Sequence, residues 1–292
     1  MTHIPVLINE VLEHLDPKPG DDFIDCTVGE GGHALAILKM TAPDGRLLGI
    51  DRDADMADRF RQRAEQLGVS ERLVVHHGNF KDIREIAKKY KFFKVKGILF
   101  DVGVSSWHID KSGKGFSFQN IETLDMRFDR TGGGTTALEI VNSWPEEVIA
   151  RIIYEFGEER HSRRIAKAIV EERKINKIVT TDQLVGVISR AVPQRGRGVH
   201  FATRTFQALR IAVNNELENI EIGIKEAINI LSSGGRVAVI SFHSLEDRIV
   251  KNIFKKEGSL RVITKKPIRP LGEEVGRNPR ARSAKLRVAE LI

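Results

Sequence analysis

Glycines and carboxylates near the N-terminus have the types and the spacing of a nucleotide-binding site. An apolar run ends at Asp25, and Gly29, Gly31 and Gly32 follow it. This is the sequence pattern of a strand, a tight turn and the first turn of a helix, where open α/β sheets bind nucleotide-like ligands. A second apolar run stops at Asp51, 22 residues after Gly29. Because an acid about 20 residues after such glycines can accept hydrogen bonds from a ribose diol, the spacing predicts a ligand that contains a ribose.

The charges of this loop narrow the choice of ligand. The run from Gly29 to Ala34 satisfies the pattern G-x-G-x-x-G/A, so a dinucleotide-dependent oxidoreductase is one interpretation. A turn whose glycines only reverse the chain is another. Asp25 and Glu30 would repel a pyrophosphate, whereas the sulfonium and ammonium of S-adenosylmethionine are attracted by carboxylates. The loop therefore favours S-adenosylmethionine as the cofactor.

The overall charge favours an anionic partner. Of the 292 residues, 47 are Lys or Arg and 40 are Asp or Glu, which gives a formal net charge of +7. A basic excess favours binding to nucleic acid, although it also aids solubility. A non-enzymatic RNA-binding module is therefore a further interpretation. The length fits one large domain that carries an insertion.

Cysteine usage and hydropathy exclude several classes of protein. Cys26 is the single cysteine, which excludes an internal disulfide framework and a multi-cysteine metal site. The histidines do not form an i,i+4 pair, and we expect no structural metal. No apolar run approaches the roughly 20 residues of a membrane span, and the N-terminus lacks the features of a signal peptide. We therefore expect a cytoplasmic protein without membrane contact.

The first third of the chain alternates between strand-like and helix-like patterns. Such alternation predicts a parallel sheet with helices on both faces. The expected strands are Asp22–Cys26, Arg46–Ile50, Leu73–His76 and Val95–Phe100, and the expected helices include Ala57–Leu67 and Asp82–Tyr90.

A helical segment interrupts this pattern after Asp101. Glycine, serine and aromatic residues run from Gly103 to Phe118, and residues 137–188 have the pattern of amphipathic helices without strands between them. We expect an inserted helical domain over residues 111–202, with residues 1–110 and 203–292 forming the core.

The α/β pattern then resumes. The sequence predicts one long helix over Thr203–Leu231, a strand over Arg236–Ser241 and a helix over Ser244–Lys256. Ser244 is expected to cap this last helix, with Asp247 as its capping-box partner. Two final β-like runs, Leu260–Thr264 and Ala284–Leu291, are expected to close the sheet as a hairpin.

Seven motifs follow one another along the chain. They are Asp25-x-Thr27-x-Gly29-x-Gly31-Gly32-His33, Asp51-Arg52-Asp53, Gly78-Asn79-Phe80, Asp101-Val102-Gly103-Val104-Ser105-Ser106, Gly115-Phe116-Ser117-Phe118, Leu124-Asp125-Met126-Arg127 and Gln207-Ala208-Leu209-Arg210-Ile211-x-Val213-Asn214-x-Glu216-Leu217. Together they resemble the RsmH (MraW) methyltransferases of bacteria, and the resemblance extends from His3 to the C-terminus. It implies the α/β fold of a class I S-adenosylmethionine-dependent methyltransferase, Rossmann-like with a mostly parallel seven-stranded sheet and an inserted helical domain. It also implies methylation of the exocyclic amino nitrogen of a cytidine in the decoding region of 16S ribosomal RNA, within the small subunit.

The resemblance also implies cofactor contacts. By position these fall on Gly31, Gly32, His33, Asp51, Phe80, Asp101 and His108. The family commonly has Gln at position 108, and an imidazole titrates near neutral pH where an amide does not. Asp51 is expected to hold the ribose diol, and Phe80 to stack on the adenine or pack beside it. Asp101 would accept a hydrogen bond from the adenine or from the target amine.

The catalytic proton acceptor is not assigned by the sequence. Many amino-group methylases carry an Asp/Asn/Ser-Pro-Pro-aromatic segment after the fourth strand, whereas this chain has Asp101-Val102-Gly103-Val104. A cytosine amino group is a poor nucleophile, so the site must align it and accept its hydrogen bonds. The candidates are Asp101, Ser105, Ser106 and Asp125.

A base in structured RNA must be turned out to reach a methyl donor, and aromatic faces usually receive it. The aromatic candidates are Trp107, Phe116, Phe118 and Trp144. The candidates for phosphate contacts are Gln194–Gly198, Arg204, Arg210 and Arg277–Arg287, and the glycines of the first segment would let the backbone approach a phosphate. The sequence leaves open whether the substrate is free RNA or the assembled subunit, and whether the protein forms a homodimer.

Overall fold

The computed structural model describes residues 5–192 and 200–292. Its contacts divide the chain into two units. Unit 1 comprises Met1–Gly103 and Leu217–Ile292, and unit 2 comprises Val104–Glu216. The candidate phosphate-binding segment Gln194–Gly198 lies outside the described residues.

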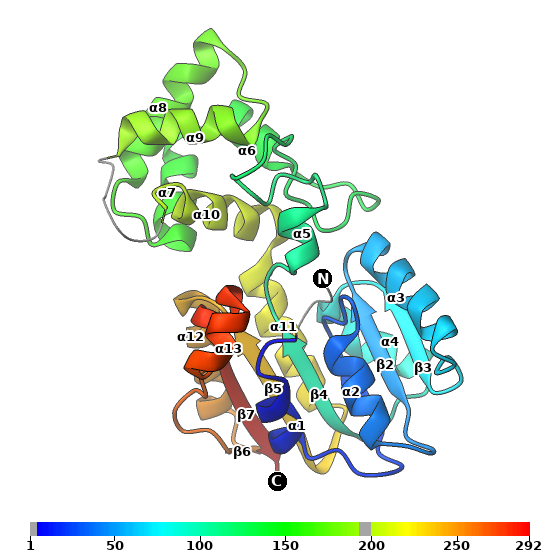
Figure 1. Ribbon diagram of the computed structural model, residues 1–292. Coiled ribbons are helices and arrows are strands. Elements are labelled where there is room, and N and C mark those ends of the chain that lie inside the picture. Colours follow the sequence, from blue (N-terminus) through cyan, green and yellow to red (C-terminus); the bar gives the residue numbers. More distant parts are fainter. Residues whose placement is uncertain (1–4, 193–199) are drawn as a thin grey trace. The chain divides into compact units, whose positions relative to one another are not determined.

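Unit 1 is built on a seven-stranded sheet with the strand order β3-β2-β1-β4-β5-β7-β6 (Figure 1). The first five strands in sequence are parallel, whereas β7 runs antiparallel to both of its neighbours. The order reverses between β1 and β4, and ligands bind at such a switch point. This arrangement is the class I methyltransferase fold and confirms the predicted fold class. The strands are β1 (Phe23–Asp25), β2 (Leu47–Asp51), β3 (Leu73–His77), β4 (Val95–Asp101), β5 (Leu231–Ser241), β6 (Leu260–Val262) and β7 (Lys285–Leu291).

Helices cover both faces of this sheet. Helices α4, α11 and α12 pack on one face, and α1, α2 and α3 pack on the other. The helices are α1 (Ile8–Leu15), α2 (Gly32–Met40), α3 (Ala54–Gln66), α4 (Ile83–Lys89), α11 (Glu216–Ile228), α12 (Ser244–Lys256) and α13 (Gly272–Arg277), with 3-10 turns η1 (Phe80–Asp82) and η2 (Pro279–Ser283).

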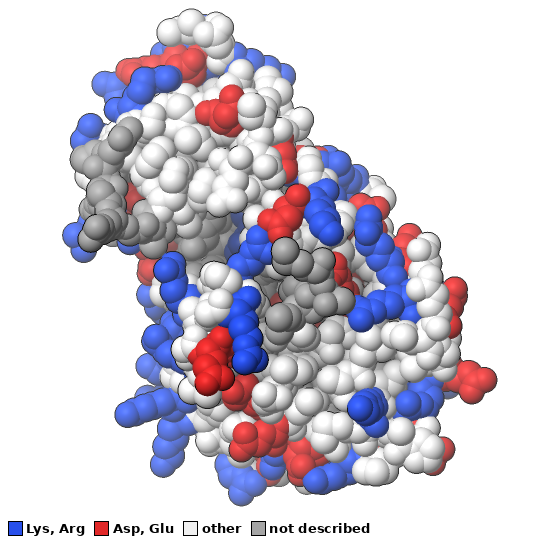
Figure 2. All heavy atoms as spheres, viewed as in Figure 1, with Lys and Arg blue, Asp and Glu red and all other residues white. Residues whose placement is uncertain are grey.

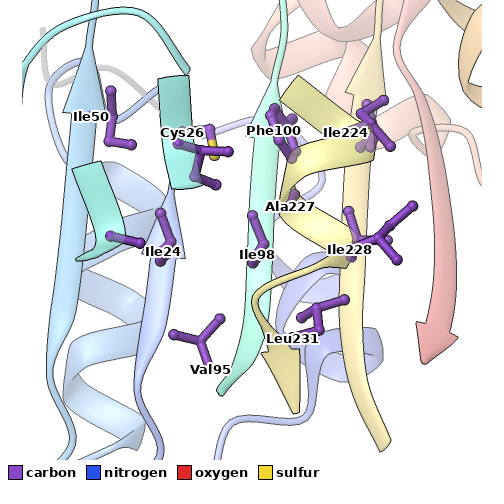
Figure 3. Close-up of a cluster of buried hydrophobic side chains, with 14 of the residues drawn as sticks. Ile24, Cys26, Ile50, Val95, Ile98, Phe100, Ile224, Ala227, Ile228 and Leu231 are labelled. Atoms are coloured by element: carbon purple, nitrogen blue, oxygen red, sulfur yellow. The ribbon is translucent and has the colours of Figure 1, made fainter. Parts of the chain in front are cut away.

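The buried strands make the core beneath the candidate site rigid. Ile24 and Ile98, on neighbouring strands, are fully buried beside Ile224 and Ile228 of α11 (Figure 3). Full burial of an aliphatic side chain of this size contributes about 1.5–3 kcal/mol. The strand ends that hold the site residues are therefore fixed by a close-packed layer.

The end of the chain confirms one prediction and corrects another. The two last β-like runs pair antiparallel as β6 and β7, as expected. The predicted cap of α12 is wrong by one residue, because His243 is the extended residue before the helix. Glu246 accepts hydrogen bonds from the backbone N–H of His243, at 3.2 Å, and of Phe242, at 2.7 Å. Glu246, rather than Asp247, therefore completes the capping box.

Unit 2 is helical over much of its described length. Its helices bury a separate apolar core that includes Ile149, Ile165, Leu184 and Leu209. They are α5 (Ser106–Asp110), α6 (Ala137–Ser143), α7 (Glu146–Gly157), α8 (Ser162–Ile175), α9 (Thr181–Ala191) and α10 (Thr203–Asn214).

The predicted long helix over Thr203–Leu231 is wrong, because two helices, α10 and α11, occupy it. Asn215 adopts a left-handed conformation with φ 50° and ends α10. The buried side chain of Asn214 donates to the carbonyl of Met126 at 2.7 Å and accepts from the N–H of Phe128 at 3.1 Å. Helix α10 therefore packs within unit 2, whereas the sequence predicts it in the α/β core domain together with the rest of residues 203–292.

The unit boundaries differ accordingly from the expected ones. They lie at Gly103 and Glu216 rather than at 110 and 202. No helix of the described residues is both long enough and apolar enough to cross a bilayer.

Candidate active site

Three carboxyl groups meet at one edge of the sheet in unit 1. Asp25, Asp51 and Asp101 end β1, β2 and β4, and β1 lies between the other two strands. Parallel strands end at the same edge of a sheet, so the structure brings these three predicted residues together. The edge is rich in carboxyl groups, whose ionised forms would attract the cationic cofactor expected from the sequence.

Asp51 is tied to the glycine turn. One of its carboxylate oxygens accepts a hydrogen bond from the N–H of Gly29, and the other accepts one from the N–H of Asp53, both at 2.8 Å. A carboxylate offers about four lone-pair sites, so Asp51 retains capacity to accept from a diol. The same residue therefore fixes the turn and presents acceptors beside it.

The backbone of the turn has a shape that only glycine adopts readily. Gly29 and Gly31 have φ of 51° and 81°, in the left-handed region. A Cβ on Gly31 would lie 1.7 Å from the ring of Phe60, and one on Gly32 would lie 2.3 Å from Pro5. The turn is therefore packed against Phe60 and Pro5, and side chains at these two positions would displace it.

Asp101 presents an unpartnered oxygen. Its backbone N–H donates to the hydroxyl of Thr27 at 2.7 Å, which joins the end of β4 to the turn. Its side chain is 19% exposed, and its Oδ1 atom is buried without a hydrogen-bond partner. Nδ1 of His33 lies 3.8 Å from Oδ2, too far for a hydrogen bond, while Nε2 of His33 lies 2.9 Å from the carbonyl of Val6. His33 thus anchors the N-terminal segment to the site.

Burial shifts the titration of two of these carboxyl groups. Burial, and then the nearby charges of Asp25 and Glu246, raise the pKa of Asp101 to about 8. Burial, opposed by a hydrogen bond from Thr27 and reinforced by Asp51, raises the pKa of Asp25 to about 7. A cation bound at this edge would favour the ionised forms of both groups.

These shifts predict how stability depends on pH. Both pKa values lie above the ordinary value of 3.8, so the folded chain binds more protons than the unfolded chain between about pH 4 and about pH 8. The free energy of unfolding therefore falls as pH rises through this window. Replacing Asp101 by Asn, which mimics the neutral form, is expected to reduce the fall in Tm between about pH 6 and about pH 9, and to raise Tm at the upper end. Calorimetry across this range measures both effects.

Asp58→Asn is the matched control for this experiment. Asp58 lies on α3 with a side chain that is 64% exposed, and it pairs with Arg61 at the surface. The Asp58→Asn change removes an exposed carboxylate and leaves the buried ones in place. The dependence of Tm on pH should therefore follow that of the original protein. An Asp101→Asn protein with the original slope would mean that Asp101 is already ionised near pH 6.

Phe80 lies at the end of β3, in turn η1. Its ring packs edge-to-face on Phe100 of β4, with 5.5 Å between the centroids. A Cβ on Gly223 of α11 would lie 2.7 Å from the same ring. Phe80 is half-buried, so it packs on the core and keeps part of its surface exposed. The expectation that it contacts adenine remains a prediction.

His108 lies in unit 2, where it has a local structural role. Ser105 caps α5, its hydroxyl lies 2.8 Å from Nδ1 of His108, and its backbone N–H donates to the same nitrogen. The His108 ring is buried and packs edge-to-face on Trp107, Phe116 and Phe128. Its expected cofactor contact stays a prediction.

The remaining candidates for the proton acceptor also lie in unit 2. Asp125 receives two hydrogen bonds from the guanidinium of Arg127, at 2.8 and 3.0 Å, and pairs with Arg130 at 3.1 Å. Burial alone would raise the pKa of Asp125, but the bonds from Arg127 outweigh it and the pKa is lowered. Asp125 is therefore a weak base. Ser106 is the first residue of α5 and is half-buried.

Ion pairs hold several of the predicted phosphate-binding cations. Arg210 forms two hydrogen bonds with Glu216, at 2.8 and 2.9 Å, and Arg204 lies 3.7 Å from Glu159. In unit 1, Arg287 pairs with Asp247 at 2.6 Å. These arginines stabilise the fold before any ligand arrives.

The predicted aromatic platform has two separate parts in unit 2. Phe116 stacks on Phe128, with ring centroids 5.1 Å apart. Phe118 stacks on His200, with centroids 4.5 Å apart and planes at 12°. Trp144 packs at the margin of the unit 2 core.

Two residues of the site were missed from the sequence. Thr27, which bonds to Asp101, was noted only as part of a motif. Glu246, whose charge raises the pKa of Asp101, lies one residue before Asp247, which the sequence predicts as the capping-box partner. The capping-box spacing counted from His243 would have identified it.

Comparisons with known proteins agree with this geometry. The model of the MraW methylase family matches residues 1–292. Proteins named Ribosomal RNA small subunit methyltransferase H are similar to the chain: that of Thermomicrobium roseum is 45% identical, covering 100% of this chain and 94% of its own. That of Thermotoga neapolitana is 48% identical, covering 99% and 96%. A structure from Clostridium thermocellum, assigned as an rRNA methylase, shares the fold with a TM-score of 0.50 at 11% identity, over 100% of both chains.

Proposed function

This chain belongs to the MraW methylase family, and from this premise we propose that it methylates the exocyclic amino nitrogen of a cytidine in the decoding region of 16S ribosomal RNA. Family membership makes it an S-adenosylmethionine-dependent methyltransferase, rather than an oxidoreductase or a non-enzymatic RNA-binding module. The names of its relatives support the small-subunit RNA as substrate. We also propose that it acts in the cytoplasm, where it meets that RNA.

The observation that carries the proposal is the unpartnered oxygen of Asp101 at the carboxyl-rich edge. A buried carboxyl oxygen without a hydrogen-bond partner costs free energy unless a ligand satisfies it. Asp25 lies at the same edge on the neighbouring strand β1, and Asp51 lies on β2, the strand beyond it. In their ionised forms these carboxyl groups would repel phosphates and stabilise the cationic groups of S-adenosylmethionine. The residues present therefore fit this cofactor.

Each residue of the edge then has a distinct task. When bound, S-adenosylmethionine supplies an electrophilic methyl group on its sulfonium. We propose that Asp51 accepts hydrogen bonds from the ribose diol while it holds the turn at Gly29. Phe80 would offer the exposed part of its ring to the adenine. Asp101 and Asp25 would balance the positive charge, which favours their ionised forms although their pKa values are raised.

The proposal is tested by methyl transfer to defined substrates. Small-subunit particles from a strain that lacks the enzyme are incubated with the protein and labelled S-adenosylmethionine, and the RNA is digested and mapped by mass spectrometry. We expect label in one cytidine of the decoding region, as N4-methylcytidine. Fully modified particles serve as the control and should take up no label.

Two outcomes would overturn the proposal. Label on the ring carbon of the cytosine would contradict the target atom. Label elsewhere in the RNA, or transfer only to another class of molecule, would contradict the substrate.

A further inference from the structure

A short cationic segment is anchored to the sheet edge in unit 1. Thr264 donates its backbone N–H to the carbonyl of Val288 at 3.2 Å, and its hydroxyl accepts from the N–H of Val288 at 2.8 Å. Four residues later, Ile268 exchanges two hydrogen bonds of 2.9 Å with Leu286. Lys265 and Lys266 lie between these two anchors. The backbone that carries them is therefore fixed at both ends.

The anchors place this segment at the level of the candidate active site. Asp101 is in register with Ile240 of β5, Ile240 with Leu286 of β7, and Leu286 with Ile268. Neighbouring strands lie about 4.8 Å apart, so Ile268 stands roughly 14 Å from Asp101 across the sheet. A polynucleotide whose base enters the site could therefore pass over the segment a few nucleotides away.

The charges of this segment lack acidic partners among the described residues. Lys265, Lys266 and Arg269 are exposed, and they take part in no ion pair that the described part of the chain contains. The acids of the helix that follows are engaged elsewhere: Glu274 accepts from the N–H of Leu7 at 2.7 Å, and Glu273 lies 3.9 Å from Arg277. On the face shown in Figure 2, Lys and Arg gather along the side of unit 1 formed by α12 and α13.

We infer that Lys265, Lys266 and Arg269 form a phosphate-binding edge for the substrate RNA strand that flanks the target nucleotide. The inference rests on the proposed function and extends it to residues outside the cofactor site. Lysine and arginine without fixed partners bind phosphates strongly and without reading the base sequence. Because the backbone is already anchored, little of it has to be ordered on binding. The basic segment would thus orient the RNA strand, while the carboxyl-rich site in unit 1 selects the cofactor.

The test removes these three charges. The variant Lys265→Gln/Lys266→Gln/Arg269→Gln is compared with the control Lys91→Gln/Lys94→Gln/Lys96→Gln. The control removes three exposed lysines near the start of β4. They lie at the end of the strands opposite to the one that carries Asp101. Binding of small-subunit RNA is measured over a range of salt concentrations, KM and kcat are measured with particles, and Kd is measured for S-adenosylmethionine.

We expect the variant to bind RNA about 10-fold more weakly. The negative slope of log K against log salt should become shallower by about two, since each lost phosphate contact reduces its size by about 0.7–0.9. KM for particles should rise in parallel, with kcat and the Kd for S-adenosylmethionine within twofold of the original. The control should bind RNA within about twofold of the original protein.

Three results would overturn the inference. An unchanged RNA affinity and salt slope would show that the edge is merely solvated, and an equal loss in the control would show that only net charge matters. A loss confined to assembled particles, with naked RNA bound normally, would point to an acidic protein partner instead. In each of these cases the original protein still methylates its substrate, so only the inference about the basic segment fails. If the proposed function were wrong, the original protein itself would transfer no methyl group to the RNA.

Discussion

The variant Asp51→Ala is expected to bind S-adenosylmethionine at least about 100-fold more weakly than the original protein. Hydrogen bonds to a charged group contribute about 1.5–3 kcal/mol each, and loss of both bonds to a diol removes about 3–6 kcal/mol. Each 1.4 kcal/mol corresponds to about a tenfold change in Kd. The substitution also frees the N–H groups of Gly29 and Asp53, which Asp51 holds at 2.8 Å. Isothermal titration calorimetry measures the change directly.

A matched control separates this effect from the loss of charge alone. Asp58→Ala removes an exposed carboxylate from α3 and should leave the Kd within about twofold of the original. Asp51→Asn should resemble Asp51→Ala more than the original, because an amide nitrogen cannot accept a hydrogen bond. If Asp51→Ala bound the cofactor as tightly as Asp58→Ala does, other residues would have to hold the ribose. The ribose contact predicted from the spacing between Gly29 and Asp51 would then be wrong.

The strand ends of unit 1 could be predicted because local signals and tertiary packing agree there. The apolar runs that stop at Asp25, Asp51 and Asp101 are buried strands whose last residue reaches the ligand edge. Their order in the sheet then follows from the fold class that the alternation of strands and helices implies. Asp51 and Asp101, both assigned to the cofactor, thus lie at one edge with Asp25 because each of the three marks the end of a strand.

The division at α10 and α11 is hard to predict because contacts distant in the sequence accompany it. The helical periodicity continues across Asn215, where α10 ends in a left-handed residue, and the neighbouring Asn214 bonds to the loop at Met126 and Phe128. These contacts span almost ninety residues of sequence. The local signal that favours a break is the Asn-Asn pair inside the helical run, since asparagine tolerates the left-handed region.

The sign of the charge that the site attracts could be predicted from the sequence, but the pKa values of its carboxyl groups could not. An acidic loop indicated a cationic ligand, yet the raised pKa of Asp101 depends first on its burial and then on Asp25 and Glu246, which three separate elements bring together. In the same way, the basic run from Arg277 to Arg287 was predicted to contact RNA, whereas Asp247 pairs with Lys285 and Arg287. Lys265 and its neighbours, by contrast, have no acidic partner among the described residues. Pairing between α12 and β7, which a sequence does not display, therefore engages only part of the predicted basic run.

Gly31→Ala is expected to lower Tm by about 5–15 °C and to weaken cofactor binding by about 10-fold or more. An alanine at φ 81° costs about 1–2 kcal/mol, and forcing its Cβ to within 1.7 Å of the Phe60 ring adds about 1–3 kcal/mol of overpacking. For a chain of this size each kcal/mol lowers Tm by about 2–4 °C. Relief of the clash must move either the first turn of α2 or the ring of Phe60, and a displaced turn would disturb the cofactor site beside Asp51. Calorimetry gives Tm, and titration with S-adenosylmethionine gives Kd.

Gly68→Ala is the control that isolates the backbone cost of Gly31→Ala. Gly68 has φ 68° after the end of α3, and a Cβ there would meet nothing within 4 Å. Its substitution should cost only the backbone term of about 1 kcal/mol, lower Tm by a few degrees and leave cofactor binding unchanged. The double variant Gly31→Ala/Phe60→Leu should lose less stability than the sum of its single changes, because the shorter side chain removes the ring atoms that the new Cβ meets. If Gly31→Ala and Gly68→Ala behaved alike in both measurements, the packing of Phe60 against the turn would have no part in forming the site.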